Sequence, residues 1–182
     1  SHTVQPVNSL AVFPIVWGSI FLFVAQGIAL QEVVLSQLGE KQENKPVLLG
    51  FTLRLAAGLA LILVLVFFSP FSHILYYRIF GLSEELAVLA GPAARLLAVM
   101  PFLTLWGAWQ RAMHMHRRKT VPITVSSAFE VLVAAAVMWL MPQFSTLPGV
   151  ILAPFALAGG RIAGLAWLEW SWRRIRASAV AI

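Results

Sequence analysis

The sequence contains no cysteine and no aspartate, and only 11% of its 182 residues are charged. Without cysteine, the chain can form no disulfide, no thiolate metal site and no thiol nucleophile. Without aspartate, it cannot assemble the aspartate-rich magnesium sites of membrane prenyl- and phosphatidyl-transferases. It has 60% apolar residues and a mean hydropathy of +0.85, whereas a soluble domain has about 45–50% apolar and about 25% charged residues. This composition argues against a soluble enzyme or a free nucleic-acid binder and predicts a chain that lies in a lipid bilayer.

Five apolar runs are long enough to cross a membrane. A bilayer core about 30 Å thick requires about 20 apolar residues in a helix. Each run ends at a proline, a glycine or a cluster of charges, as helices do, and barrel strands would give runs of only about 10 residues. We therefore predict an all-α integral membrane protein with a single membrane domain over residues 1–182 and five transmembrane helices: Leu10–Leu30, Val47–Phe68, Leu86–Gln110, Val121–Met141 and Gly149–Trp170.

The connections between the runs are of three kinds, of which one is the predicted tight turn Gln143–Pro148. Gly39–Pro46 and the basic stretch Arg111–Thr120 are predicted to be solvated loops. Pro70–Gly81 is too short to span and too apolar for a free loop. Its apolar residues occur at helical spacing together with Tyr76 and Tyr77, which predicts a short interfacial helix in the headgroup layer.

The distribution of lysine and arginine predicts the orientation. Of the thirteen basic residues, one end of the predicted bundle would hold nine, the opposite end would hold only Arg78, and three fall within spans. By the positive-inside rule, the nine are cytoplasmic, beside the anionic inner leaflet. The N-terminus is then outside and the C-terminus is inside, in a plasma (inner) membrane. The nine residues are Lys41, Lys45, Arg111, Arg117, Arg118, Lys119, Arg173, Arg174 and Arg176.

Aromatic residues are expected at the two membrane boundaries, where their amphipathic rings act as anchors. Tyr76, Tyr77 and Trp139 would mark the outer boundary. The cytoplasmic boundary would hold five tryptophans: Trp106, Trp109, Trp167, Trp170 and Trp172.

The amino-terminal end carries no basic residue before the first span. It therefore resembles neither a signal peptide nor an ordinary first helix. We expect the chain to be a fragment, or a processed piece, of a larger membrane protein.

Charges within the spans point to a functional site, because each costs at least about 2.5–3.5 kcal/mol at the bilayer centre. Arg54 lies about 10 Å from the nearer end of its span and can extend its guanidinium to the surface. Arg95 and Glu130 each lie about 14 Å into their spans, and Arg161 lies about 18 Å in. These three residues are predicted to meet near the midplane.

Two interpretations of these three residues stay open. An Arg–Glu pair can simply orient the helices. Alternatively, Arg95, Glu130 and Arg161 line a water-filled cavity with a net charge of +1, which leaves one arginine to bind an anionic substrate. Glu130 shares a helix face with Ser126 and Ser127, which predicts that this face looks into the bundle.

Two further patterns bear on packing. Prolines inside spans permit kinks, and the last span carries a seam of small residues that predicts close helix packing. The prolines are Pro14, Pro92, Pro101 and Pro154, and the seam is Ala153, Ala156, Gly160 and Gly164.

The sequence gives little support to an enzyme, a metal site or a cofactor. His114 and His116 are two residues apart, so on a helix they do not converge on a metal, and we expect them in a headgroup-facing basic loop. Arg117–Lys119 adjoins a span and suits an anionic leaflet rather than nucleic acid. Neither H-E-x-x-H nor G-x-S-x-G occurs.

Two consecutive segments carry a family resemblance: ARLLAVMPFLTLWGAWQRAMHMHRRKT (94–120) and VPITVSSAFEVLVAAAVMWLMPQF (121–144), which are followed by a turn and a glycine-rich last span. Together they resemble one half of the multidrug/oligosaccharidyl-lipid/polysaccharide (MOP) exporter superfamily. This superfamily includes multidrug and toxin extrusion (MATE) transporters and lipid-linked sugar flippases. The stretches 95–101, 117–120 and 122–127 are most similar to the progressive ankylosis family of pyrophosphate, nucleotide and citrate exporters.

The resemblance implies a transporter of two six-helix bundles, in which these five helices would be the eighth to twelfth. The partner would then be a missing N-terminal half. The deep charges are mostly arginine, unlike those of cation-coupled drug exporters, which argues against a sodium- or proton-coupled drug antiporter. We expect an alternating-access exporter, antiporter or flippase half that moves an anionic small solute or a lipid-linked phosphate. The alternatives are a non-transporting membrane scaffold or subunit and a transferase acting on lipid-linked phosphates, whose essential residues would cluster around 111–119.

Overall fold

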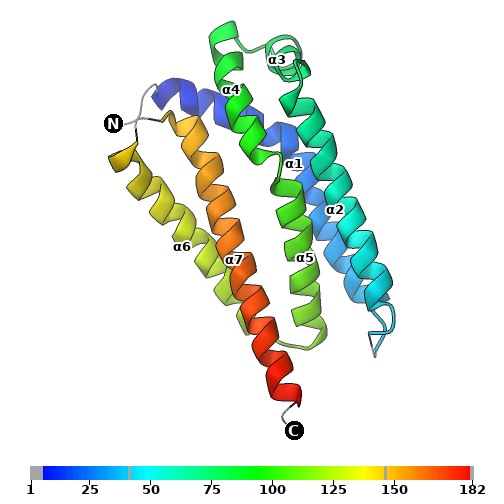
Figure 1. Cartoon of the computed structure of the whole chain (residues 1–182). Coiled ribbons are helices and arrows are strands. Elements are labelled where there is room, and N and C mark those ends of the chain that lie inside the picture. Colours follow the sequence, from blue (N-terminus) through cyan, green and yellow to red (C-terminus); the bar gives the residue numbers. More distant parts are fainter. Residues whose placement is uncertain (1–5, 41, 146, 181–182) are drawn as a thin grey trace.

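The computed structural model describes residues 6–40, 42–145 and 147–180, with side chains for 11–40, 42–145 and 147–175. This part of the chain is helical and contains no strand (Figure 1). Its elements, in chain order, are α1 (Pro6–Gln37), α2 (Lys45–Phe68), α3 (Phe71–Ile74), the π-helix η1 (Leu75–Ile79), α4 (Glu84–Leu97), α5 (Met100–His116), α6 (Val121–Phe144) and α7 (Gly149–Val180).

Five stretches of these helices are long and apolar enough to cross a membrane, which confirms the prediction of an all-α, multi-pass membrane protein. They are Ala11–Gln37, Lys45–Phe68, Glu84–His116, Val121–Phe144 and Gly149–Ile175.

Two predicted boundaries were wrong. The first helix continues seven residues past Leu30 to Gln37, because no helix breaker occurs before Gly39, whose φ is +76°. The basic stretch after Gln110 is also helical as far as His116, so Arg111 belongs to α5 and not to a loop.

The third span is divided into two helices. α4 ends at Leu97 and α5 begins at Met100, immediately before Pro101. Pro101 has no N–H to donate to the preceding turn, which accounts for a break at this position. By contrast, Pro14, Pro92 and Pro154 lie within continuous helices, so of the four prolines expected to permit kinks, only Pro101 is at a break.

α5 is the central helix of one half of the bundle. It packs against α1, α2 and α7, while α6 runs antiparallel to α7 and packs mainly on it (Figure 1). Two apolar cores result, one at each end of the bundle. The first lies between α1, α4 and the end of α2, and the second lies between α1, α5 and the start of α2.

The segment predicted as a short helix over Pro70–Gly81 is helical, as α3 and η1. The expectation that Tyr76 anchors at the outer boundary was wrong, since its side chain is fully buried in the first core. Its ring stacks between Phe67 and Phe80, and its hydroxyl is 3.0 Å from the Ser19 hydroxyl.

The start of α2 and the ends of α5 and α7 lie together at one end of the bundle, which we call the basic end (Figure 1). Lys45 and Arg117 both lie over the ring of Trp172, with 5.5 and 4.6 Å from Lys45 Nζ and Arg117 Cζ to its centroid. Of the nine basic residues predicted to share this side, Lys41 and the side chain of Arg176 lie outside the described part of the chain. Trp109 and Trp172, expected as boundary anchors, are instead buried, at 5% and 9% exposure.

Candidate functional site

Two glycines of α7 bring α6 into close contact. A Cβ added to Gly160 would collide with the Glu130 carbonyl oxygen, and one added to Gly164 would lie 3.0 Å from Ser126 Oγ. The Ser126 hydroxyl donates a 3.0 Å hydrogen bond to the Gly164 carbonyl. The predicted small-residue seam is therefore confirmed as a packing surface at these two positions, because it lets the two backbones approach closely.

This close approach positions an ion pair within the spans. Arg161 follows Gly160 on α7, and its Nε lies 3.1 Å from Oε1 of Glu130 on α6. Their side chains are 20% and 27% exposed, respectively. Of the two deep arginines that were candidates to pair with Glu130, Arg161 is the one that does so, but Ser127 does not share the buried face. Its hydroxyl is exposed and donates to Ile123 O on its own helix.

A second arginine lies within electrostatic range of this pair. Arg111 of α5 lies close enough to interact electrostatically with both Arg161 and Glu130. Its Nε donates a 3.3 Å hydrogen bond to Gln31 Oε1 on α1. A Cβ added to Gly107 would lie 3.4 Å from Arg111 Nη1, so the guanidinium lies against the α5 backbone one turn earlier. We call Arg111, Glu130 and Arg161 the charge cluster. It joins three helices and has a net charge of +1.

Arg95 is not part of this cluster. The expectation that it meets Glu130 and Arg161 was therefore wrong. Arg95 is exposed on α4, and its Nε donates a 3.2 Å hydrogen bond to Phe67 O at the end of α2. Its guanidinium also lies over the Phe68 ring, 5.7 Å from the centroid. This arginine donates to one of the last carbonyls of a neighbouring helix, where a positive charge is favourable.

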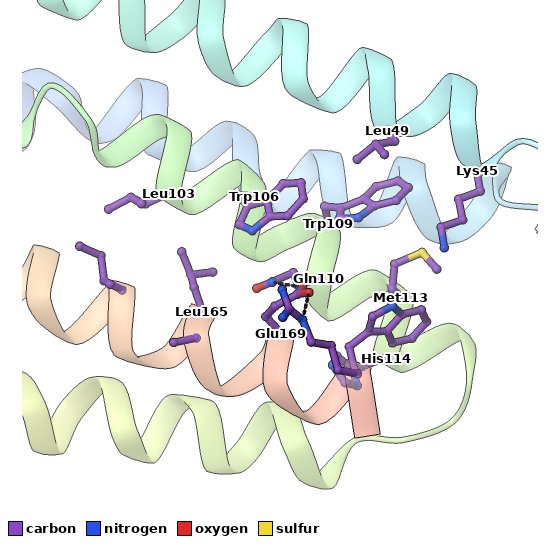
Figure 2. A pocket seen from close by; sticks show the side chains of 14 residues that line it. Lys45, Leu49, Leu103, Trp106, Trp109, Gln110, Met113, His114, Leu165 and Glu169 are labelled. Atoms are coloured by element: carbon purple, nitrogen blue, oxygen red, sulfur yellow. Dashed lines mark hydrogen bonds and ion pairs between the residues drawn. The ribbon is translucent and has the colours of Figure 1, made fainter. Parts of the chain in front are cut away.

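A cavity of about 590 Å³ lies between α2, α5 and α7 (Figure 2). Three tryptophans contribute to its wall, and we call it the tryptophan cavity. They are Trp106, Trp109 and Trp172. The cavity and the charge cluster use different faces of α5, since Gln110 lines the cavity whereas Arg111 points to α1.

Polar side chains occupy the wall of this cavity toward the basic end. Gln110 Nε2 donates to Glu169 Oε2 over 3.4 Å, and Arg173 Nε donates to Glu169 Oε1 over 3.0 Å. His114 is 1% exposed, with Nε2 3.2 Å from Leu168 O. The expectation that His114 faces the headgroups in a loop was wrong, because α5 continues past it and turns it toward α7.

The sequence contains a pattern that could have predicted this wall. Trp106, Gln110 and Met113 follow at spacings of four and three, and Trp109 lies beside them, so they share one helical face. Among the described residues, no group of three or more His, Cys, Asp or Glu side chains is placed to hold a metal ion.

No family model matches the chain, and neither a curated protein nor a solved structure is significantly similar to it.

Proposed function

We propose that this chain is part of an alternating-access membrane exporter or flippase that moves an anionic small solute or a lipid-linked phosphate. The observation that carries the proposal is the charge cluster, in which Arg161 pairs with Glu130 and a second guanidinium, that of Arg111, lies within electrostatic range of both, inside membrane-spanning helices. One carboxylate neutralises one arginine, so a positive charge is left for an anionic group of the substrate. Such sites near the membrane midplane are typical of transporters.

The divided third span supports the same proposal. Discontinuous helices are frequent in transporters, where their ends contribute to solute sites and allow parts of a bundle to move. The break after Leu97 lies inside the longest apolar stretch, Glu84–His116, and α5 after the break carries Arg111. A movement at the break would therefore displace one member of the charge cluster relative to the other two.

The proposal is tested by flux in inverted vesicles that contain the complete protein. The probes are radiolabelled pyrophosphate, as a small anion, and a fluorescent prenyl phosphate, as a lipid-linked phosphate. Arg111→Gln and Arg161→Gln are expected to lower transport of the true substrate class by about 10- to 100-fold, because a hydrogen bond to a charged group contributes about 1.5–3 kcal/mol. Arg54→Gln, at an exposed position on α2, is the matched control and is expected to transport normally.

The scaffold alternative is favoured by the tight α6–α7 packing around the ion pair, and the same variants test it. If the chain is a non-transporting scaffold in which the pair only fixes helix contacts, the wild-type protein transports neither probe. The variants then change the stability of the protein alone. Normal flux in Arg111→Gln and Arg161→Gln, at normal protein levels, would rule out the cluster as the solute site.

A further inference from the structure

The tryptophan cavity has an apolar end and a polar end along the axis of the bundle. Leu103 lies at one end of the lining residues, Gln110 and Glu169 lie in the middle, and Lys45 and His114 lie at the other (Figure 2). Trp106 extends the apolar end. A ligand that fits this order has an apolar part toward the centre of the bundle and a polar part toward the basic end.

The wall of the cavity from Gln110 in the middle to His114 toward the basic end contains buried hydrogen-bond acceptors. Gln110 uses its amide N–H toward Glu169, and its Oε1 is buried without a partner. His114 Nε2 faces a carbonyl, which only accepts, so Nε2 carries the hydrogen and Nδ1 of the neutral ring is an acceptor. Nδ1 is also buried without a partner. Buried acceptors that lack a partner favour a ligand with a hydroxyl or N–H donor.

The outer end of the cavity is cationic. Lys45 lies over the Trp172 ring, and Arg173, whose side chain is 77% exposed, extends beside Glu169 at the mouth. The pair of Arg173 with Glu169 joins residues four apart on an exposed helix face, which is a weak interaction. An arginine and a lysine at the mouth of a cavity attract a phosphate group.

We propose that the tryptophan cavity binds a lysophospholipid, a single-chain lipid with a free hydroxyl beside its phosphate. The chain would lie along Trp106 and Leu103, the hydroxyl would donate to Gln110, and the phosphate would meet Lys45 and Arg173. A diacyl lipid fits less well, because it carries a second ester where the lysolipid has its hydroxyl, and ester oxygens would face the acceptors of the wall. The volume of about 590 Å³ suits one small ligand.

This inference goes beyond the proposed function, because the cavity is separate from the charge cluster and binding requires no transport. It is tested with the complete protein in nanodiscs of phosphatidylcholine, by titration with lysophosphatidic acid whose chain is brominated. Bromine quenches tryptophan fluorescence on contact. The exposed Trp139 and Trp170 are replaced by phenylalanine so that quenching from surrounding lipid is small.

Saturable quenching is expected. Competition with unlabelled lipids then identifies the groups that bind. Monoacylglycerol, which lacks the phosphate, is expected to compete about 10- to 100-fold more weakly, and an alkyl phosphate, which lacks the hydroxyl, about 3- to 10-fold more weakly. In Gln110→Leu, the advantage of the hydroxyl should disappear while that of the phosphate remains.

Two matched variants separate cavity binding from contact with bulk lipid. Ala166 lines the cavity, and Ala128 lies on the exposed face of α6. Ala166→Phe fills the cavity and is expected to weaken quenching at least 10-fold, whereas Ala128→Phe should leave it unchanged. Thermal unfolding of both variants checks that they fold. Lys45→Gln, at a position outside the packed core, provides a second test, because it should remove the advantage of the phosphate while that of the hydroxyl remains.

Three results would overturn the proposal. Equal quenching in Ala166→Phe and Ala128→Phe would place the lipid outside the cavity. Equal competition by unlabelled diacyl phosphatidate and unlabelled lysophosphatidate would show ordinary annular lipid. Equal competition by glycerol phosphate would show a site for free phosphate. Binding in a protein that transports neither flux probe would support this site while opposing the proposed function, so the two can fail separately.

Discussion

At the scale of single residues, burial controls the chemistry of Tyr76. Its phenol is enclosed by Phe67 and Phe80 and shares a hydrogen bond with Ser19. Burial disfavours the phenolate and raises the pKa of Tyr76 to about 12, although the hydrogen bond with Ser19 acts in the opposite direction. The neutral phenol is thus part of the folded core.

This pKa predicts a loss of stability in alkali. Between pH 10 and pH 12, the unfolded chain releases the Tyr76 proton while the folded protein keeps it, so the free energy of unfolding falls as pH rises. The loss approaches about 2 kcal/mol at the upper limit. It is measured as the pH dependence of thermal unfolding in mild detergent, and the phenolate absorbance reports the titration itself. Tyr76→Phe should remove this component, whereas Tyr77→Phe should leave it. An unchanged alkaline slope in Tyr76→Phe contradicts the assignment.

The sequence predicted two of the three residues of the charge cluster for a sound physical reason. Glu130 needed a cation, and its spacing from Ser126 indicated a face turned into the bundle, so a pair with a deep arginine, Arg95 or Arg161, was expected. The choice of Arg95 over Arg111 was wrong because a residue's depth in the membrane was counted from predicted helix ends. Since α5 continues to His116, Arg111 lies inside a helix and Arg95 lies on the exposed side of α4.

At the scale of helices, adjacent glycines on α7 predict opposite outcomes. A Cβ at Gly160 would collide with a backbone carbonyl of α6, but one at Gly159 would come no closer than 4.0 Å, to Val137 Cγ2. Gly160→Ala is therefore expected to force α6 and α7 apart and to destabilise the protein by about 1–3 kcal/mol. Gly159→Ala should be neutral or slightly stabilising, because alanine favours the helix.

The measurement is the thermal unfolding midpoint of each variant in the same detergent, with Gly159→Ala as the matched control. An equal midpoint for both variants would show that the two helices do not depend on this contact. Gly160→Ala is also expected to weaken the Arg161–Glu130 ion pair, because Gly160 precedes Arg161 on the part of α7 that meets α6.

The helices themselves were largely predictable, but some of their details were not. Long apolar runs fixed the spans, since a bilayer requires a set length of apolar helix. Sequence could not decide which proline interrupts a helix, because Pro14, Pro92 and Pro154 are accommodated in continuous helices and Pro101 is not. The π-helix at Leu75–Ile79 also has no residue pattern that predicts it.

At the scale of the whole molecule, the tryptophan cavity was beyond prediction. Its wall combines residues from α2, α5 and α7, which lie far apart in the chain, and a cavity depends on how three helices fail to fill the space between them. The shared face of Trp106, Gln110 and Met113 was visible in the sequence, but the helices that would cover that face were not.

The same arrangement predicts how the chain crosses the membrane. Lysine and arginine gather at the basic end, which the positive-inside rule places in the cytoplasm. Because the chain has no cysteine, single substitutions give specific reporters. In intact cells, a membrane-impermeant maleimide should label His73→Cys, at the α3 end, but should label Lys119→Cys only after the cells are opened. Leu61→Cys, exposed within α2, should stay unlabelled in both conditions, because its thiol lies in lipid. The reverse labelling of the first two positions would invert the orientation and place the mouth of the tryptophan cavity at the outer leaflet.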